Sequence, residues 1–274
     1  MRVYNINMKK FVFLLLLIFA VIFILTPVYL MVKISLSPPP EILREHPALG
    51  MEGVTFSHWQ RILAAGQVWA PLRKSLTVAA LSVVFSLLLG IPGAYALARL
   101  PFKWSSAILL FIFLSRMIPE VEIALPVSIG FIRAGLLDTD LGLTLAHTLR
   151  ILPIVTWILV GSFRAIPRDL EDAAFVDGCG KVRSLLTIMV PLALPGIAVA
   201  AIFGFLGSWD EFTYAVYLAI TEQTLPLVVY YYLNRASFFL ASAYATIITI
   251  PVVIVTYCLQ KYLKAEYLAG AVKG

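Results

Sequence analysis

The sequence predicts an all-α membrane protein with six transmembrane helices. Hydrophobic residues make up 61% of the 274 residues and charged residues only 13%, whereas a soluble globular domain is nearer a quarter charged. The mean hydropathy of +0.94 agrees with this class. Long apolar runs recur along the chain, and a helix needs about 20 apolar residues to cross a bilayer. Helices are expected because an open sheet edge leaves backbone polar groups unsatisfied in lipid.

Six segments have the length and composition of a span. They are approximately residues 11–32, 76–98, 106–132, 141–163, 185–206 and 243–263. The first follows Arg2, Lys9 and Lys10 and has the charge pattern of a signal peptide. Its apolar run is too long for a signal sequence and no small-residue cleavage site follows, so we expect a retained span. The third is expected to be broken in the middle, because Pro119 favours a kink.

Basic residues orient the chain. Twelve Lys and Arg residues flank one side of the predicted spans and seven flank the other, which predicts that both termini are cytoplasmic. The net charge of +6 therefore reflects the membrane interface and gives no reason to expect nucleic acid. The expected organisation is a cytoplasmic N-terminus with the first span (1–33), an extracytoplasmic loop (34–72), a core domain (73–265) containing a cytoplasmic loop (164–184), and a cytoplasmic tail (266–274).

The external loop carries one candidate helix. Residues 55–70 place aromatic and aliphatic side chains at helical spacing, whereas the run Ser37-Pro38-Pro39-Pro40 argues against helix earlier in the loop. The apolar residues are Phe56, Trp59, Ile62, Leu63 and Trp69. They would serve either as an anchor at the membrane interface, where Trp is common, or as a docking surface for an external partner.

A polar segment, residues 167–178, interrupts the apolar sequence between the fourth and fifth spans. Pro167 suits the first turn of a helix, three acidic residues favour its N-terminus, and Gly178 can adopt the left-handed conformation that ends it. A second short helix with Lys181 and Arg183 is expected from Gly180. One face holds Leu170, Ala173, Ala174 and Asp177. Two alanines leave room for a partner on this face, although an ordinary loop helix on the membrane has the same composition.

The run Asp172-Ala173-Ala174, followed by Gly178, Ile188 and Pro191, resembles the EAA loop of ABC importer permeases. Asp172 stands where that family usually has Glu, and Glu171 precedes it. The resemblance implies a type I ABC importer permease-like fold, in which this loop docks into a cleft of a cytoplasmic ATPase subunit. The residues that would make this contact are Glu171, Asp172, Ala173, Ala174, Asp177 and Gly178.

Other stretches resemble carbohydrate permeases of the maltose-transporter type. They are residues 116–119 (Arg-Met-Ile-Pro), 208–215 (Ser-Trp-Asp-Glu-Phe-Thr-Tyr-Ala) and 224–227 (Thr-Leu-Pro-Leu). With the EAA-like loop, the resemblance covers most of residues 70–265 and implies the smaller of that group's two permease chains. It implies a non-catalytic subunit in a bacterial or archaeal cell membrane that forms half of a sugar pathway. The expected partners are a second permease subunit, two ATPase subunits that carry ATP and Mg, and an external sugar-binding protein; no cofactor is expected on this chain.

Two groups of charged residues are candidates for the pathway or its gate. Arg116, Glu120 and Glu122 lie in the third apolar segment, where a charge at the bilayer centre costs about 2.5–3.5 kcal/mol unless it meets a partner or a cavity. Arg116 and Glu120 are spaced to pair on one helix face. Trp209, Asp210 and Glu211 combine a flat aromatic ring with hydrogen-bond acceptors, as sugar sites commonly do. A structural ion pair and a loop at the outer interface are the alternatives.

The sequence lacks several motifs, and their absence argues against some functions for this chain. A nucleotide-binding loop around Gly180 and Lys181 would need Gly at 175 and Ser or Thr at 182, but the sequence has Phe175 and Val182. The three histidines form no metal-binding spacing, and Cys179 and Cys258 are placed too differently for a structural disulfide. If the chain is a permease, its solute could instead be a polyol, a sugar phosphate or another compound. The other classes are an ion-coupled secondary transporter and a membrane enzyme acting on lipid through Asp210 and Glu211.

Overall fold

The computed structural model describes residues 2–64, 66–235 and 237–271, and the side chains from Lys10 to Cys258 apart from the two gaps. Every regular element within these residues is a helix. The chain divides into two units: residues 1–68 with 228–250, and residues 69–227 with 251–274. The helix α13 (Leu225–Asn234) and the long helix α14 (Phe238–Ala271) contribute to both.

The first unit begins with α1 (Arg2–Leu36), whose apolar stretch is not buried by the rest of the chain. Its C-terminal end joins a small folded region that contains α2 (Pro39–Ile42) and α3 (Ser57–Ala64). The buried Glu41 accepts hydrogen bonds from the backbone N–H groups of Glu52 and Gly53, both at 3.1 Å, and its carboxylate lies 3.9 Å from the buried Lys33 Nζ. The expectation of no helix at residues 37–40 was wrong. Pro38 is the N-cap and two prolines follow in the first turn, where a missing N–H leaves no hydrogen bond unmade.

The expected helix at residues 55–70 is shorter than its pattern indicates. It ends at Ala64, Gly66 follows with φ +64°, and Trp69 already belongs to α4 (Trp69–Arg99). Ile62 is fully buried, whereas the side chains of Phe56 and Leu63 remain exposed. The choice between an interfacial anchor and a docking surface stays open.

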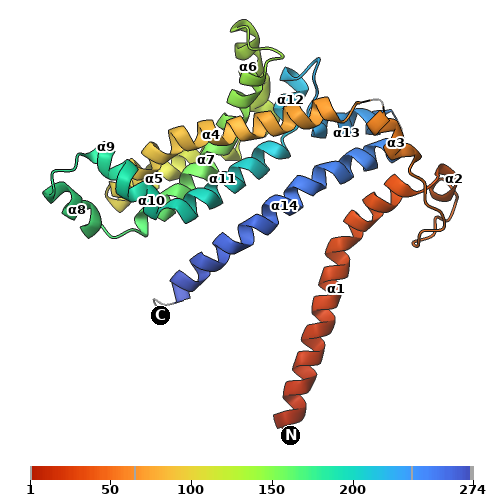
Figure 1. Ribbon diagram of the computed structural model, residues 1–274, viewed down its shortest axis with the longest axis horizontal. Helices are drawn as coiled ribbons and strands as arrows, with labels where there is room; N and C mark the ends of the chain where they lie inside the picture. Colours follow the sequence, from red (N-terminus) through yellow and green to blue (C-terminus); the bar gives the residue numbers. More distant parts are fainter. Residues whose placement is uncertain (1, 65, 236, 272–274) are drawn as a thin grey trace. The chain divides into compact units, whose positions relative to one another are not determined.

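The second unit is built around three helices that lie side by side (Figure 1): α4, α7 (Asp140–Arg164) and α11 (Leu194–Trp209). One buried cluster joins them through Ala94 of α4, Leu159 of α7 and Ala200 of α11, and another includes Leu143 and Leu218. Small residues permit this packing. A Cβ atom built on Gly196 would lie 1.8 Å from Ser162 Oγ, so α7 and α11 touch there almost backbone to backbone.

The remaining helices of this unit are short. They are α5 (Phe102–Leu114), the 3₁₀ turn η1 (Ser115–Met117), α6 (Glu120–Arg133), α8 (Asp169–Val176), α9 (Lys181–Ser184), the π-helical η2 (Leu185–Met189), α10 (Val190–Leu192) and α12 (Thr213–Leu218). The predicted third span is broken at Pro119, as expected, into helices of 13 and 14 residues. The predicted fifth span bends by 80° between Leu192 and Leu194.

Four of the described helices are long and apolar enough to cross a membrane: Lys10–Leu36, Trp69–Arg99, Asp140–Arg164 and Phe238–Cys258. The bent pair Lys181–Leu192 and Leu194–Trp209 makes a fifth candidate if it is counted as one span. The broken third segment is not among the candidates, because neither of its halves reaches the necessary length. A count of six spans stays a prediction.

Candidate functional site

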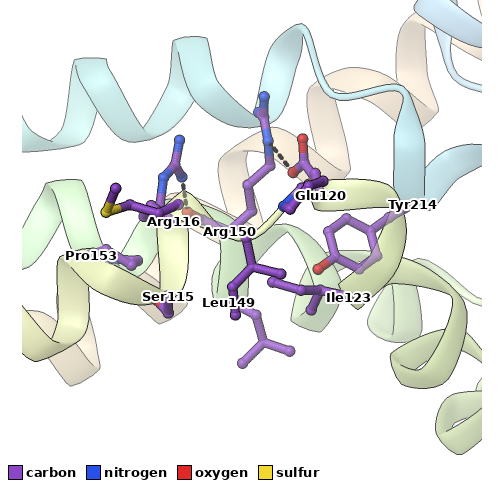
Figure 2. A pocket seen from close by; sticks show the side chains of 11 residues that line it. Ser115, Arg116, Glu120, Ile123, Leu149, Arg150, Pro153 and Tyr214 are labelled. Atoms are coloured by element: carbon purple, nitrogen blue, oxygen red, sulfur yellow. Dashed lines mark hydrogen bonds and ion pairs between the residues drawn. The ribbon is translucent and has the colours of Figure 1, made fainter.

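The break in the third predicted span opens a cavity of about 440 Å³. Ile118 and Pro119 are extended, so the chain leaves η1 and restarts as a helix at Glu120. The cavity is lined by this break, by α7 and by Tyr214 of α12 (Figure 2). Pro119 lacks an N–H to donate to the preceding turn and its ring crowds that turn, which favours a break here. The break thus leaves an open cavity lined by charged as well as apolar side chains, with Met117 77% exposed at its edge.

Arg150 is the centre of the polar contacts around this cavity. Its Nε lies 2.6 Å from Glu120 Oε1 and its Nη1 lies 3.2 Å from Asp210 Oδ1. The same nitrogen donates a hydrogen bond to the carbonyl oxygen of Gly207. Arg116 donates to the backbone carbonyl of Arg150, and Figure 2 shows this contact and the Glu120 pair side by side. One guanidinium thereby links the broken helix, α7 and the end of α11.

The predicted pair between Arg116 and Glu120 is not formed. The spacing of four residues brings side chains together only on a continuous helix, and Pro119 separates these two residues onto different elements. Arg150 takes the place of Arg116 as the partner of Glu120. Sequence reasoning could have found Arg150 from its position inside the predicted fourth span, since an arginine there needs a partner for the same reason as Glu120.

The residues after α11 divide into buried and open positions. Trp209 is 1% exposed and stacks on Phe205, with 5.5 Å between the ring centroids. Glu211 is 2% exposed and accepts hydrogen bonds from the N–H groups of Tyr214 (2.8 Å) and Ala215 (3.3 Å), which cap α12. Its other contact is His147, whose Nε2 lies 2.9 Å from Glu211 Oε2. Of the three residues, only Asp210 has an open side chain, which is 70% exposed.

Glu122, the remaining pathway candidate, is exposed on the first turn of α6 and does not line the cavity. The structure thus brings Arg116, Glu120 and Asp210 together around Arg150 and leaves Glu122 apart. Among the described residues, no three His, Cys, Asp or Glu side chains are grouped as metal ligands.

The polar segment 167–178 forms α8 as a separate short helix. Pro167 precedes the N-cap residue Arg168, Gly178 follows the helix with φ +79°, and α9 then begins at Lys181. The four residues predicted to share one face do not have one environment, because Ala174 is 5% exposed whereas Leu170 is 46% exposed. The predicted contact residues that are open to solvent are Asp172, Ala173, Asp177 and Gly178.

Glu171 faces the interior of its own chain. It is 6% exposed, and its carboxylate accepts hydrogen bonds from the Tyr95 hydroxyl and from Arg99 Nε, both on α4. Arg99 also donates to the carbonyl oxygen of Phe163 on α7, at 3.3 Å. The carboxylate that the sequence assigns to a partner contact therefore attaches α8 to two long helices of this chain.

The protein has three features of an integral membrane component of a transport system. They are a helical bundle, a span broken around a cavity with a charged lining, and an exposed short helix between two spans. A family model described as the binding-protein-dependent transport system inner membrane component matches residues 86–267. The chain belongs to this family, so it is a non-catalytic inner-membrane component of a transporter.

Relatives match along nearly the whole chain. The diacetylchitobiose uptake system permease protein DasC of Streptomyces coelicolor is 30% identical over 252 residues, which are 90% of this chain and 91% of DasC. The trehalose transport system permease protein SugB of Mycobacterium tuberculosis is 30% identical over 256 residues, 91% of this chain and 93% of SugB.

The fold matches a solved transporter. A chain of a bacterial ABC transporter involved in the import of the acidic polysaccharide alginate superposes with a TM-score of 0.75 at 22% identity, covering 93% of this chain and 96% of that one. This likeness shows that the chain has the fold of ABC importer permeases.

Proposed function

We propose that this chain is one permease subunit of an ATP-driven importer for a sugar, and that it encloses half of the translocation pathway. The observation that carries the proposal is the similarity to permease proteins of diacetylchitobiose and trehalose uptake systems over about nine tenths of the chain. A polyol, a sugar phosphate or another solute is the alternative cargo.

The proposed assembly contains a second permease subunit, two ATPase subunits and an external sugar-binding protein. A related solved structure is described as an alginate ABC transporter in complex with a periplasmic protein that holds an alginate pentasaccharide. We propose six spans in the chain, with both termini and α8 on the cytoplasmic side. ATP and Mg would be held by the ATPase subunits, because this sequence has no nucleotide-binding loop.

In this assembly α8 would receive force from the ATPase subunit. The exposed Asp172 offers a charge to a basic group of that subunit, while Ala173 leaves the helix surface low enough for close approach. Glu171 would hold α8 rigidly to α4 through Arg99 and Tyr95. A docked helix that is fixed to its spans carries them with it when the ATPase subunits close.

The cavity around Arg150 is the proposed pathway or gate. The exposed carboxylate of Asp210 can accept hydroxyl hydrogen bonds from a sugar. The ion pairs to Glu120 and Asp210 hold α6, α7 and α11 in one arrangement, and their rearrangement would open or close the cavity. The ATP-bound state must favour the outward-facing arrangement for transport to be driven.

The assembled transporter in vesicles provides the test. With ATP inside and sugar-loaded binding protein outside, the wild-type complex is expected to accumulate sugar. Asp172→Lys is expected to release the ATPase subunits and abolish uptake. The control is Glu45→Lys, a charge reversal at an exposed residue of the loop 34–72, which should change neither ATPase binding nor uptake. Wild-type uptake by Asp172→Lys would contradict the coupling role, and no uptake of any sugar by the wild type would contradict the cargo.

A further inference from the structure

Two adjoining cavities lie on the outside of the helix bundle, away from the Arg150 cavity. The larger, of about 690 Å³, is a groove between α5 and α7. The smaller, of about 300 Å³, lies where α4 and α7 end and is lined by Arg99, Arg164 and Arg168. Phe102 and Arg164 line both cavities, so the two adjoin at these side chains.

The groove is apolar and open to the surroundings of the helices. Its floor contains Leu109 and Val160, which are 5% and 2% exposed. At one side, Phe113 and Trp157 meet edge to face with 4.8 Å between the ring centroids, while Trp157 remains 51% exposed. Gly161 contributes no side chain, and a Cβ built there would meet nothing within 4 Å. Because α7 has the length and composition of a span, this groove lies at the depth of a membrane.

The smaller cavity is basic and lies at the level of a membrane interface. The span-length helices α4 and α7 end at Arg99 and Arg164. Arg164 Nη2 donates a hydrogen bond of 2.6 Å to Ser105 Oγ, and its guanidinium lies 5.1 Å from the centre of the Phe102 ring. Arg164 is therefore held at the junction of the groove and the basic cavity.

Two of the three arginines retain an unbalanced charge. Arg99 is paired with Glu171. Arg168 donates to the carbonyl oxygen of Arg99, at 3.3 Å. Within the part of the chain that the structure describes, no carboxylate forms an ion pair with Arg164 or Arg168. Guanidinium groups match phosphate oxygens in charge and in hydrogen-bond geometry.

We propose that the adjoining cavities bind one anionic phospholipid, with an acyl chain in the groove and the phosphate on Arg164 and Arg168. A basic pocket between membrane helices at the interface is a recognised type of lipid headgroup site. The unbalanced positive charge favours a lipid with net negative charge over a zwitterionic lipid, whose ammonium group would meet the arginines. A helix of another subunit is the alternative occupant of the apolar groove, and the labelling experiment below distinguishes it from a lipid.

The experiment uses the purified, assembled transporter after removal of loosely bound lipid. The complex is incubated with equal amounts of phosphatidylglycerol and phosphatidylcholine of the same chain length, and retained lipid is counted by native mass spectrometry. The wild type is expected to retain one phosphatidylglycerol for each copy of this chain. Arg164→Gln with Arg168→Gln should lower its affinity roughly thirtyfold, since one interfacial arginine contributes about a fivefold gain.

Two further variants separate the charge from the groove. Arg183→Gln removes a basic residue that lines neither cavity and should retain the lipid as the wild type does. Gly161→Phe places a ring in the open groove, keeps both arginines and should also release the lipid. Unchanged thermal unfolding of each variant shows that the fold is intact.

Retention of phosphatidylglycerol by the double arginine variant would overturn the proposal, as would equal retention of the two lipids by the wild type. A photoreactive residue in place of Ser106, which lines the groove, should label lipid in the assembled transporter. Labelling of a neighbouring subunit instead would show that a protein fills the groove, and would overturn the proposal as well.

Discussion

Arg150 shows how one side chain can hold several membrane helices together. Its side chain is 20% exposed and meets Glu120, Asp210 and the carbonyl of Gly207. Arg150→Met removes the partner of both carboxylates and leaves the carbonyl unpaired. We expect a loss of about 1–3 kcal/mol of stability, at the modest end because Glu120 and Asp210 are partly solvated. The measurement is the thermal unfolding midpoint of the purified complex.

Arg116→Met is the matched control for this change. Arg116 lines the same cavity but is exposed and donates only to the carbonyl of Arg150. It should therefore lower the unfolding midpoint less than Arg150→Met does. Equal midpoints for the two variants would show that Arg150 is not the centre of the contacts.

Asp138 gives a pH-dependent link between two loops outside the spans. Burial alone would raise the pKa of its carboxyl, but hydrogen bonds from the Thr221 side chain and from the N–H groups of Thr221 and Ile220 hold this pKa below its ordinary value, with help from Lys74. Stabilisation by a carboxyl with a lowered pKa is present above the ordinary value of about 4 and is lost as the pH falls through the folded-state pKa.

Hydrogen exchange at the amides of Ile220 and Thr221 measures this link. At neutral pH both amides should be more protected than in Asp138→Asn, a variant that keeps a side chain able to adopt the observed φ of 59°. Below about pH 4 the difference should shrink toward zero as Asp138 is protonated. A difference that stays constant into acid would mean that the charge of Asp138 is not what holds the loops.

Helix α8 carries a buried acidic residue, Glu171, and an exposed one, Asp172, and we expect the two to have different roles. Glu171→Ala leaves Arg99 without its carboxylate and frees α8 from α4, at a cost of about 3 kcal/mol, the lower end of the range for broken buried pairs. Hydrogen exchange of residues 169–176 should therefore accelerate in the isolated chain. Asp172→Ala should leave that exchange unchanged, because Asp172 is exposed. Equal exchange in both variants would remove the internal role of Glu171.

The contact of α7 with α11 depends on the missing side chain of Gly196. A Cβ there would come within 2.4 Å of Ser162 Cβ, which cannot rotate away, so Gly196→Ala should push the helices apart. We expect a loss of about 1–3 kcal/mol, as for other overpacked cores. Adding Ser162→Gly should restore part of the loss, because the two changes share one space. Gly93→Ala, with nothing within 4 Å, is the control in thermal unfolding and should not lower stability, because Ala favours a helix over Gly. Equal loss there would mean that the contact of α7 with α11 is not the cause.

In the molecule as a whole, local sequence patterns predicted where several helices begin and end. They did not predict which residues far apart in the sequence contact each other. The break at Pro119 and the end of α8 at Gly178 were both predicted from single residues. A proline alone does not fix a break, however, because Pro92 and Pro153 lie inside continuous helices. The charge of Arg150 within a predicted span indicates that it needs a partner, but its pairing with Glu120 in particular could not be predicted. Arg150 lies 30 residues away on another helix, and only the packing of α7 against the broken span brings the two charges together. Glu171 was assigned to an external contact by its resemblance to the EAA loop, and its partners on α4 are too distant in sequence to have been predicted.

The energy source distinguishes the proposed importer from an ion-coupled transporter that would use Arg116, Glu120 and Glu122 as a proton relay. The structure favours the importer, because Glu120 is paired with Arg150 and Glu122 lies outside the cavity, so the three residues do not form a continuous relay. In vesicles containing the full assembly, uptake should stop without ATP and should persist when ionophores remove the proton and sodium gradients. Glu120→Gln should slow this uptake without changing its dependence on ATP, since the substitution disturbs the contacts of α6 with α7 but not those of α8. Uptake by this chain alone under an imposed ion gradient would contradict the importer and restore the relay.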